Sequence, residues 1–138
     1  MGTLTDAKVV YGSAATAGGF SNEEVWVKVT YDFSTDGGEV EDNILFTAGA
    51  DLIITDYYMN VTTAVTSGGS LVMDVGVGAG GVEIASNIAV ATMVLNYVVG
   101  SAADKVRVPA AGTVQMGIEA AAATAGVIEF NFKVRKDI

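Results

Sequence analysis

A glycine-rich run is the sharpest match to a chemical motif in this sequence. Gly76-Val77-Gly78-Ala79-Gly80-Gly81 fits the G-x-G-x-x-G pattern of dinucleotide-binding loops and directly follows an apolar segment. That chemistry needs a strand–helix–strand unit, and an acidic residue about 20 positions further on to hold the ribose. Positions 94–96 hold valine, leucine and asparagine instead, and a Ser-Gly-Gly-Ser hairpin before the run indicates antiparallel pairing. We therefore expect a glycine-rich loop rather than a nucleotide site.

A cluster of acidic residues could imitate a calcium loop. Its members are Asp36, Glu39, Glu41 and Asp42. Their spacing does not give the ligand order of an EF-hand, so we expect a solvated turn and no metal site. Pooled carboxylates between subunits remain open as a calcium site, although nothing in the sequence demands one. Paired carboxylates for glycoside hydrolysis also remain open, but no particular pair stands out.

Two residue types that carry much of enzyme chemistry are missing. The sequence contains no cysteine and no histidine. Their absence removes disulfides, cysteine nucleophiles, Ser-His-Asp triads, histidine-ligated zinc and the usual general base at neutral pH. We expect a protein without a cofactor and without enzymatic activity.

Four aromatic side chains could stack on a sugar ring: Trp26, Tyr57, Tyr58 and Tyr97. Such residues more often belong to a core or to a protein interface, where aromatics dominate the contact area. Asn60-Val61-Thr62 fits the glycosylation sequon, and we interpret it as part of a strand face.

The elements that position these residues follow a period of two. In VWVKVTYDF, residues 25–33, apolar side chains alternate with Trp26, Lys28, Thr30 and Asp32. GVIEFNFKVRK, residues 126–136, repeats this alternation near the C-terminus. The pattern is typical of half-buried strands. Three further segments are rich in β-branched and aromatic residues: VEDNILFT, DLIITDYYMNVTTAVT and SLVMDVGV.

Turn residues separate these segments at roughly 8–15-residue intervals, which suits a sandwich of short strands. Residues 67–70, Ser-Gly-Gly-Ser, predict a hairpin, and residues 36–38 predict another turn. Residues 120–123 also predict a hairpin connection rather than a helix. We expect residues 83–99 to be irregular. The fold class predicted is all-β: an antiparallel β-sandwich.

Length, charge and hydropathy narrow the function classes. The chain has 138 residues, enough for one domain, and its net charge of −9 opposes nucleic-acid binding. Its longest apolar segment, residues 88–99, is too short to span a membrane, and we expect no secretory signal. Only 17% of the residues are charged and 51% are apolar. So charge-poor a surface indicates burial against other subunits.

The first residues show little periodicity. We expect residues 1–24 to form an extended N-terminal arm and residues 25–138 to form the sandwich domain. The candidate contact residues of the arm are Leu4, Val9, Val10 and Tyr11.

The middle and end of the chain carry a resemblance to a known family. LFTAGADLIITDYYMNVTTAVTSGGSLVMDVGVG and VPAAGTVQMGIEAAAATAGVIEFNFKV resemble small jelly-roll virion proteins of tailed bacteriophages, of the capsid decoration (cement) and fibre-head types. The resemblance implies an eight-stranded antiparallel jelly roll without catalytic residues, commonly a homotrimer. It also implies a position on the outer capsid surface, with the major capsid protein as partner, after synthesis in the host cytoplasm.

Three functions remain open. The first is a decoration protein whose trimers stabilise a capsid shell. The alternative is a carbohydrate-binding or receptor-binding module of a phage fibre or knob. The third is a hydrolase on the same sandwich, which would need an Asp/Glu pair at catalytic separation.

Overall fold

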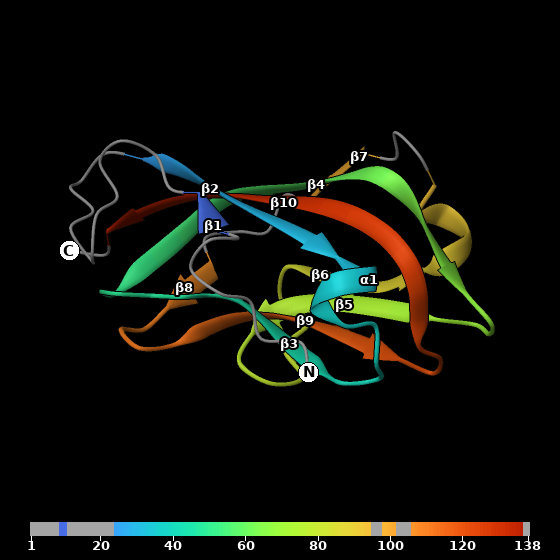
Figure 1. Ribbon diagram of the computed structural model, residues 1–138. Coiled ribbons are helices and arrows are strands. Elements are labelled where there is room, and N and C mark those ends of the chain that lie inside the picture. The colour runs from blue at the N-terminus through green and yellow to red at the C-terminus, as the bar shows by residue number, and fades with distance from the viewer. Residues whose placement is uncertain (1–8, 11–23, 95–97, 102–105, 137–138) are drawn as a thin grey trace.

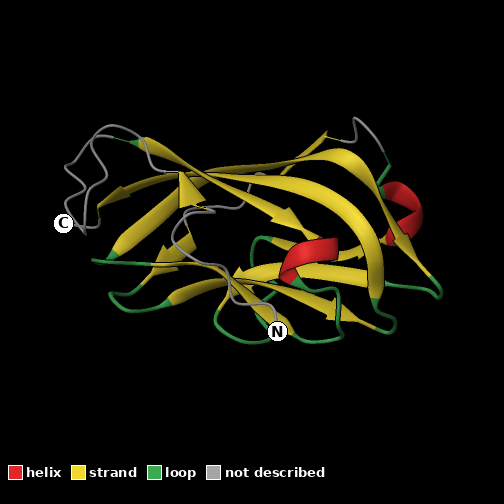
Figure 2. Ribbon diagram, viewed as in Figure 1, coloured by secondary structure: helices red, strands yellow, loops and turns green. Residues whose placement is uncertain are grey.

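Two packed β-sheets make up the protein in a computed structural model (Figure 1). The structure describes residues 9–10, 24–94, 98–101 and 106–136. Within these ranges, strands account for most of the secondary structure, and the two helical segments are short turns between strands (Figure 2). They are α1 (Phe33–Asp36) and the 3-10 turn η2 (Val90–Thr92).

The strands divide into a six-stranded sheet A and a four-stranded sheet B. Sheet A contains β1 (Val9–Val10), β2 (Val25–Asp32), β10 (Ala123–Lys136), β4 (Leu52–Ser67), β7 (Val98–Ser101) and β8 (Val106–Val108). Sheet B contains β3 (Asp42–Thr47), β9 (Thr113–Glu119), β5 (Val72–Val77) and β6 (Ala85–Ala89).

The order of the strands is that of a jelly roll. Sheet A runs β2-β10-β4 and then β7 and β8, which pair with successive stretches of the same strand, β4. Sheet B runs β3-β9-β5-β6, and every described pairing is antiparallel. Along the chain, β2 to β5 alternate between the two sheets. This arrangement confirms the predicted antiparallel sandwich of jelly-roll type.

Two turns predicted as hairpins are corners between the sheets instead. The Ser67–Ser70 turn joins β4 of sheet A to β5 of sheet B, and residues 120–122 join β9 to β10 in the same manner. The corners lie side by side, because Ser67 pairs with Ala123 and its hydroxyl donates to the Ala122 carbonyl at 2.7 Å. The hairpin predictions were therefore wrong. Turn residues reverse the chain without deciding which sheet receives the next strand.

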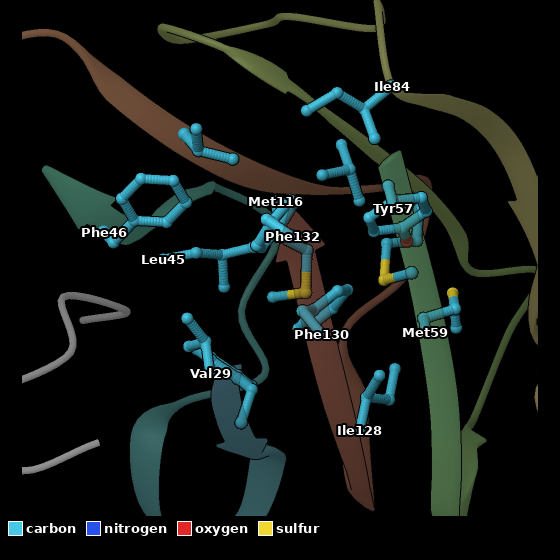
Figure 3. Close-up of a cluster of buried hydrophobic side chains, with 14 of the residues drawn as sticks. Val29, Leu45, Phe46, Tyr57, Met59, Ile84, Met116, Ile128, Phe130 and Phe132 are labelled. Carbon is cyan, nitrogen blue, oxygen red and sulfur yellow. The ribbon is translucent and has the colours of Figure 1, made fainter. Parts of the chain in front are cut away.

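Alternation along the strands fills the space between the sheets. Val27, Val29 and Tyr31 of β2 are buried, as the period of two predicts. From β10, the Phe132 ring packs at 5.3 Å, centroid to centroid, against both Tyr57 of β4 and Phe46 of sheet B. Figure 3 shows these rings together with methionine and aliphatic side chains from both sheets. The core therefore holds the two layers together through direct contacts.

Tyr31 fixes the connection that follows β2. Its hydroxyl donates to the carbonyl of Gly37 at 2.6 Å, at the end of α1. Burial raises the pKa of Tyr31 above its usual range, and the nearby acidic residues of the turn add to this effect. The neutral hydroxyl is thus kept as a hydrogen-bond donor inside the fold.

Part of the segment predicted to be irregular is ordered. Residues 85–89 form the edge strand β6, which pairs with β5, and residues 90–92 form η2. No residue of β6 is fully buried, so its sequence carries no alternation that would reveal a strand. Residues 95–97, including Tyr97, lie outside the described residues. Among the helices of the described ranges, none is long and apolar enough to cross a membrane.

Candidate functional site

The predicted arm meets the sheet at one edge. Val9 and Val10 form β1 and pair with Val29 and Lys28 of β2 in the same chain (Figure 1). Leu4 and Tyr11, the other two arm candidates, lie outside the described residues. β1 spans two residues against eight in β2, so pairing within the described part covers a short stretch of that edge.

Among the described residues, two exposed aromatic side chains lie on the outer face of sheet A. Trp26 of β2 is 39% exposed and Tyr58 of β4 is 38% exposed, and their ring centroids lie 5.4 Å apart in an edge-to-face arrangement. The ammonium of Lys133, on the intervening strand β10, lies 5.9 Å from the Trp26 ring centroid, within cation–π range. We call Trp26, Tyr58 and Lys133 the aromatic band.

Charged groups border the aromatic band. The Glu24 carboxylate lies 3.8 Å from the Lys133 ammonium and accepts a hydrogen bond from the Thr55 hydroxyl. That hydrogen bond, helped by the positive charges of Lys133 and Arg135, lowers the pKa of Glu24. The band therefore presents exposed aromatic side chains, which are enriched at protein interfaces.

The sequence places the aromatic band through strand register. Trp26 lies opposite Lys133, and Lys133 lies opposite Asp56. A β-bulge then shifts the register, because the next residue, Val134, pairs with Ile54. The predicted alternation assigned Trp26 to the outer face. The alternation does not predict that Tyr58 lies beside Trp26, because that contact depends on pairing between strands that are far apart in the sequence.

The other predicted aromatic residues have different locations. Tyr57 is 1% exposed and belongs to the core, so it cannot stack on a ligand at the surface. The sequon residues Asn60 and Thr62 lie half-buried in β4, as the strand-face interpretation predicted.

The glycine-rich run connects two antiparallel strands. Gly76 belongs to β5, and Gly78 and Gly80 turn the chain with φ angles of 74° and 75° before β6 begins. The described chain continues from this loop into a strand rather than a helix, so the unit needed to bind a pyrophosphate is missing there. The predicted glycine-rich loop is confirmed.

The acidic residues are divided between two places. Asp36 ends α1, whereas Glu41 and Asp42 line a cavity of about 480 Å³ on sheet B together with Asp74 and Glu119. The sequence analysis missed the last two. Asp74 sits inside an apolar strand and Glu119 lies far along the chain, so only the β5–β9 register brings them together. Within the described ranges, no group of three or more Asp, Glu, His or Cys residues is arranged to hold a metal ion.

The fold defines a class: a double-sheet jelly roll with an aromatic band on one outer face and an acidic cavity on the other. No protein-family profile and no curated protein sequence matches the chain.

Solved structures with a similar fold come from phage capsids. A chain of the cyanophage Pam1 capsid asymmetric unit aligns with a TM-score of 0.65 at 13% identity, covering 90% of this chain and 92% of that one. A chain of the capsid of Ralstonia phage GP4 aligns with a TM-score of 0.52 at 16% identity, covering 82% of this chain and 85% of that one. A chain of the acidic stable capsid of Helicobacter pylori bacteriophage KHP30 aligns with a TM-score of 0.54 at 13% identity, covering 91% of this chain and 92% of that one. These likenesses show a shared fold along at least 82% of each chain.

Proposed function

We propose that the chain is a structural protein of a bacteriophage virion, and that it decorates the outer surface of the capsid shell as a homotrimer. The observation that carries the proposal is the fold likeness to the Pam1 capsid chain, which covers 90% of this chain and 92% of that one. The alignment takes in nearly all of both chains, which supports a role for this chain as a complete component of a capsid. In that role the protein would need no cofactor and would catalyse no reaction.

Charge supports a position away from the packaged nucleic acid. The net charge is −9, so the protein repels phosphate backbones and gains nothing from facing DNA. Synthesis in the host cytoplasm would precede attachment to the outside of the assembled shell. There the major capsid protein would be the partner.

The mechanism of stabilisation is linkage. A protein that binds the assembled shell and not the dispersed subunits opposes rupture of the shell by its own binding free energy. Two surfaces are candidates for that contact. They are the N-terminal arm, residues 1–24, ahead of the sandwich domain of residues 25–138, and the aromatic band on sheet A.

Co-sedimentation of the purified chain with undecorated shells tests the proposal. We expect the intact chain to pellet with the shells and a variant lacking residues 1–20 to remain a folded trimer in solution. That variant should lose shell binding, because the arm would supply the clasp. Light scattering measures the trimer directly. An intact chain that stays in the supernatant at saturating shell concentration would contradict the decoration role.

The aromatic band supports a second candidate, the carbohydrate-binding or receptor-binding module of a fibre or knob. Trp26 and Tyr58 are exposed, and aromatic faces beside charged and amide groups also bind sugars. A glycan array distinguishes the two functions. Saturable glycan binding that is lost in Trp26→Ala and kept in Thr62→Ala, a variant of the same outer face, would favour the second.

A further inference from the structure

The cavity on sheet B is a groove on the side of the molecule away from the aromatic band. It lies over β3, β9, β5 and β6, the lower layer in Figure 1, and its volume is about 480 Å³. We call it the valine-walled groove, after Val40 on one side and Val82 on the other. These side chains are 55% and 50% exposed, among the most exposed large apolar residues of the described chain.

The glycine-rich run builds one wall of this groove. A Cβ at Gly76 would lie 2.2 Å from the carbonyl carbon of Gly81, and a Cβ at Gly81 would lie 2.5 Å from the amide nitrogen of Val77. The loop therefore folds back onto β5 in direct backbone contact, which only glycine allows. The Glu83 carboxylate secures the fold by accepting the Val77 N–H at 3.1 Å. Val82 stands on this anchored loop.

Carboxylates form the floor. Asp74 is 7% exposed and accepts the Asn87 backbone N–H at 2.7 Å. Asp42 and Asp74 both lie opposite Gly117 on β9, and Glu119 is two residues further along the same strand. Because Gly117 has no side chain, the Asp42 carboxylate can lie over that strand: a Cβ at Gly117 would be 2.7 Å from its oxygen.

The described residues that line the groove include four carboxylates and no lysine or arginine. The titratable groups that line the groove are Glu41, Asp42, Asp74 and Glu119, whereas β6 contributes Ser86 and Asn87. A hydrogen bond with Asp74 and the charge of that carboxylate raise the pKa of Glu119, and burial and Asp42 add to the rise. The carboxylates of Asp74 and Glu119 repel each other when both are ionised, and a positive group beside them would relieve that repulsion.

We propose that the valine-walled groove binds a lysine or arginine side chain of a partner protein. The charged head would meet Asp74 and Glu119, and the aliphatic stem would pack between Val40 and Val82. A cationic side chain fits better than a metal ion, because the described residues include no metal-ligand group. Naming a shell protein as the owner of that side chain rests on the proposed function.

A peptide titration followed by NMR tests the groove. The full chain, labelled with nitrogen-15, is titrated with acetyl-Ala-Arg-Ala-amide and with the same peptide carrying neutral citrulline. We expect saturable shifts at the amides of Val40, Val82 and Glu119, with citrulline binding about tenfold weaker because the charge is lost. Equal responses to the two peptides, or shifts that avoid the groove, would overturn the proposal.

Matched variants sharpen the test. Glu119→Gln should weaken binding of the arginine peptide by about tenfold, because a negative charge is lost. Val82→Ser should also weaken binding, because one apolar wall of the groove is lost. Glu129→Gln, on the outer face of sheet A, should leave it unchanged. Affinity should also rise with pH through the raised pKa of Glu119, because the ionised carboxylate holds the cation. A Glu129→Gln effect as large as that of Glu119→Gln would contradict the assignment.

Sedimentation with shells separates this inference from the decoration role. If the intact chain binds shells and Glu119→Gln binds equally well, the groove is not the contact although decoration stands. If the intact chain binds the arginine peptide but no shell, the groove stands and decoration fails. Self-association that Glu119→Gln abolishes would assign the groove to a second copy of this chain and overturn the proposed partner.

Discussion

Replacing Phe132 with alanine removes the ring that joins the two sheets. Phe132 is fully buried and packs at 5.3 Å against Phe46 of sheet B and against Tyr57 of sheet A. Loss of a buried phenylalanine destabilises a protein by about 3–5 kcal/mol, because transfer and cavity terms add. An unfolding entropy of about 2.1 cal/mol/K per residue implies about 0.3 kcal/mol/K for this chain, so Tm should fall by about 10–17 °C.

Differential scanning calorimetry at equal protomer concentration measures this shift, since oligomerisation makes Tm depend on concentration. Glu129→Ala is the matched control on the same strand. It breaks a surface ion pair with Lys28, of 3.1 Å, that contributes about 0–1 kcal/mol, so its Tm should change by no more than about 3 °C. A Phe132→Ala protein that melts within about 3 °C of the wild type would refute the bridging role.

Three further changes test other parts of the fold. Tyr31→Phe removes the hydrogen bond to the Gly37 carbonyl, and we expect urea unfolding to show a loss of about 0.5–1.5 kcal/mol. Gly76→Ala places a Cβ 2.2 Å from the Gly81 carbonyl carbon, and we expect a loss of at least about 1 kcal/mol, with NMR shifts centred on the loop. For Glu119, whose pKa is raised above the ordinary 4.5, we expect stability to fall as pH rises from 4.5 through the raised value. Glu119→Gln should remove that dependence.

Each of these has a control and a contrary result. Gly68→Ala meets nothing within 4 Å and should unfold like the wild type; equal destabilisation by both glycine variants would contradict the contact argument. A Tyr31→Phe protein as stable as the wild type would mean that the turn holds without the hydroxyl. The sign of the Glu119 effect follows from proton uptake, because the folded state binds that proton more tightly below the raised pKa. An unchanged pH profile in Glu119→Gln would contradict it.

The sequence predicted the two-sheet architecture better than it predicted which connections carry the chain from one sheet to the other. Alternation in β2 and β10 identified the buried faces, because a sheet with one solvated face imposes a period of two. The Ser67–Ser70 turn was interpreted as a hairpin, whereas it carries the chain to the opposite sheet. Glycine and serine permit the chain to reverse both in a hairpin and in a corner between sheets. The pairing of β4 with β10 and of β5 with β9 decides which of the two forms.

The surfaces were less accessible to sequence reasoning. Trp26 was assigned to an outer face, yet its neighbour Tyr58 required the register of two other strands. Asp74 and Glu119 meet only because β5 and β9 pair, and nothing in either local sequence indicates the other. When strand pairing brings together residues that are far apart in the sequence, the site that they form has no short sequence motif.

A cryo-EM reconstruction of the virion that carries this chain tests the central claim most directly. The account predicts jelly-roll density on the outside of the shell, in contact with the major capsid protein, into which this fold fits without rearrangement. Density at a fibre tip or knob, with none on the shell surface, would contradict it.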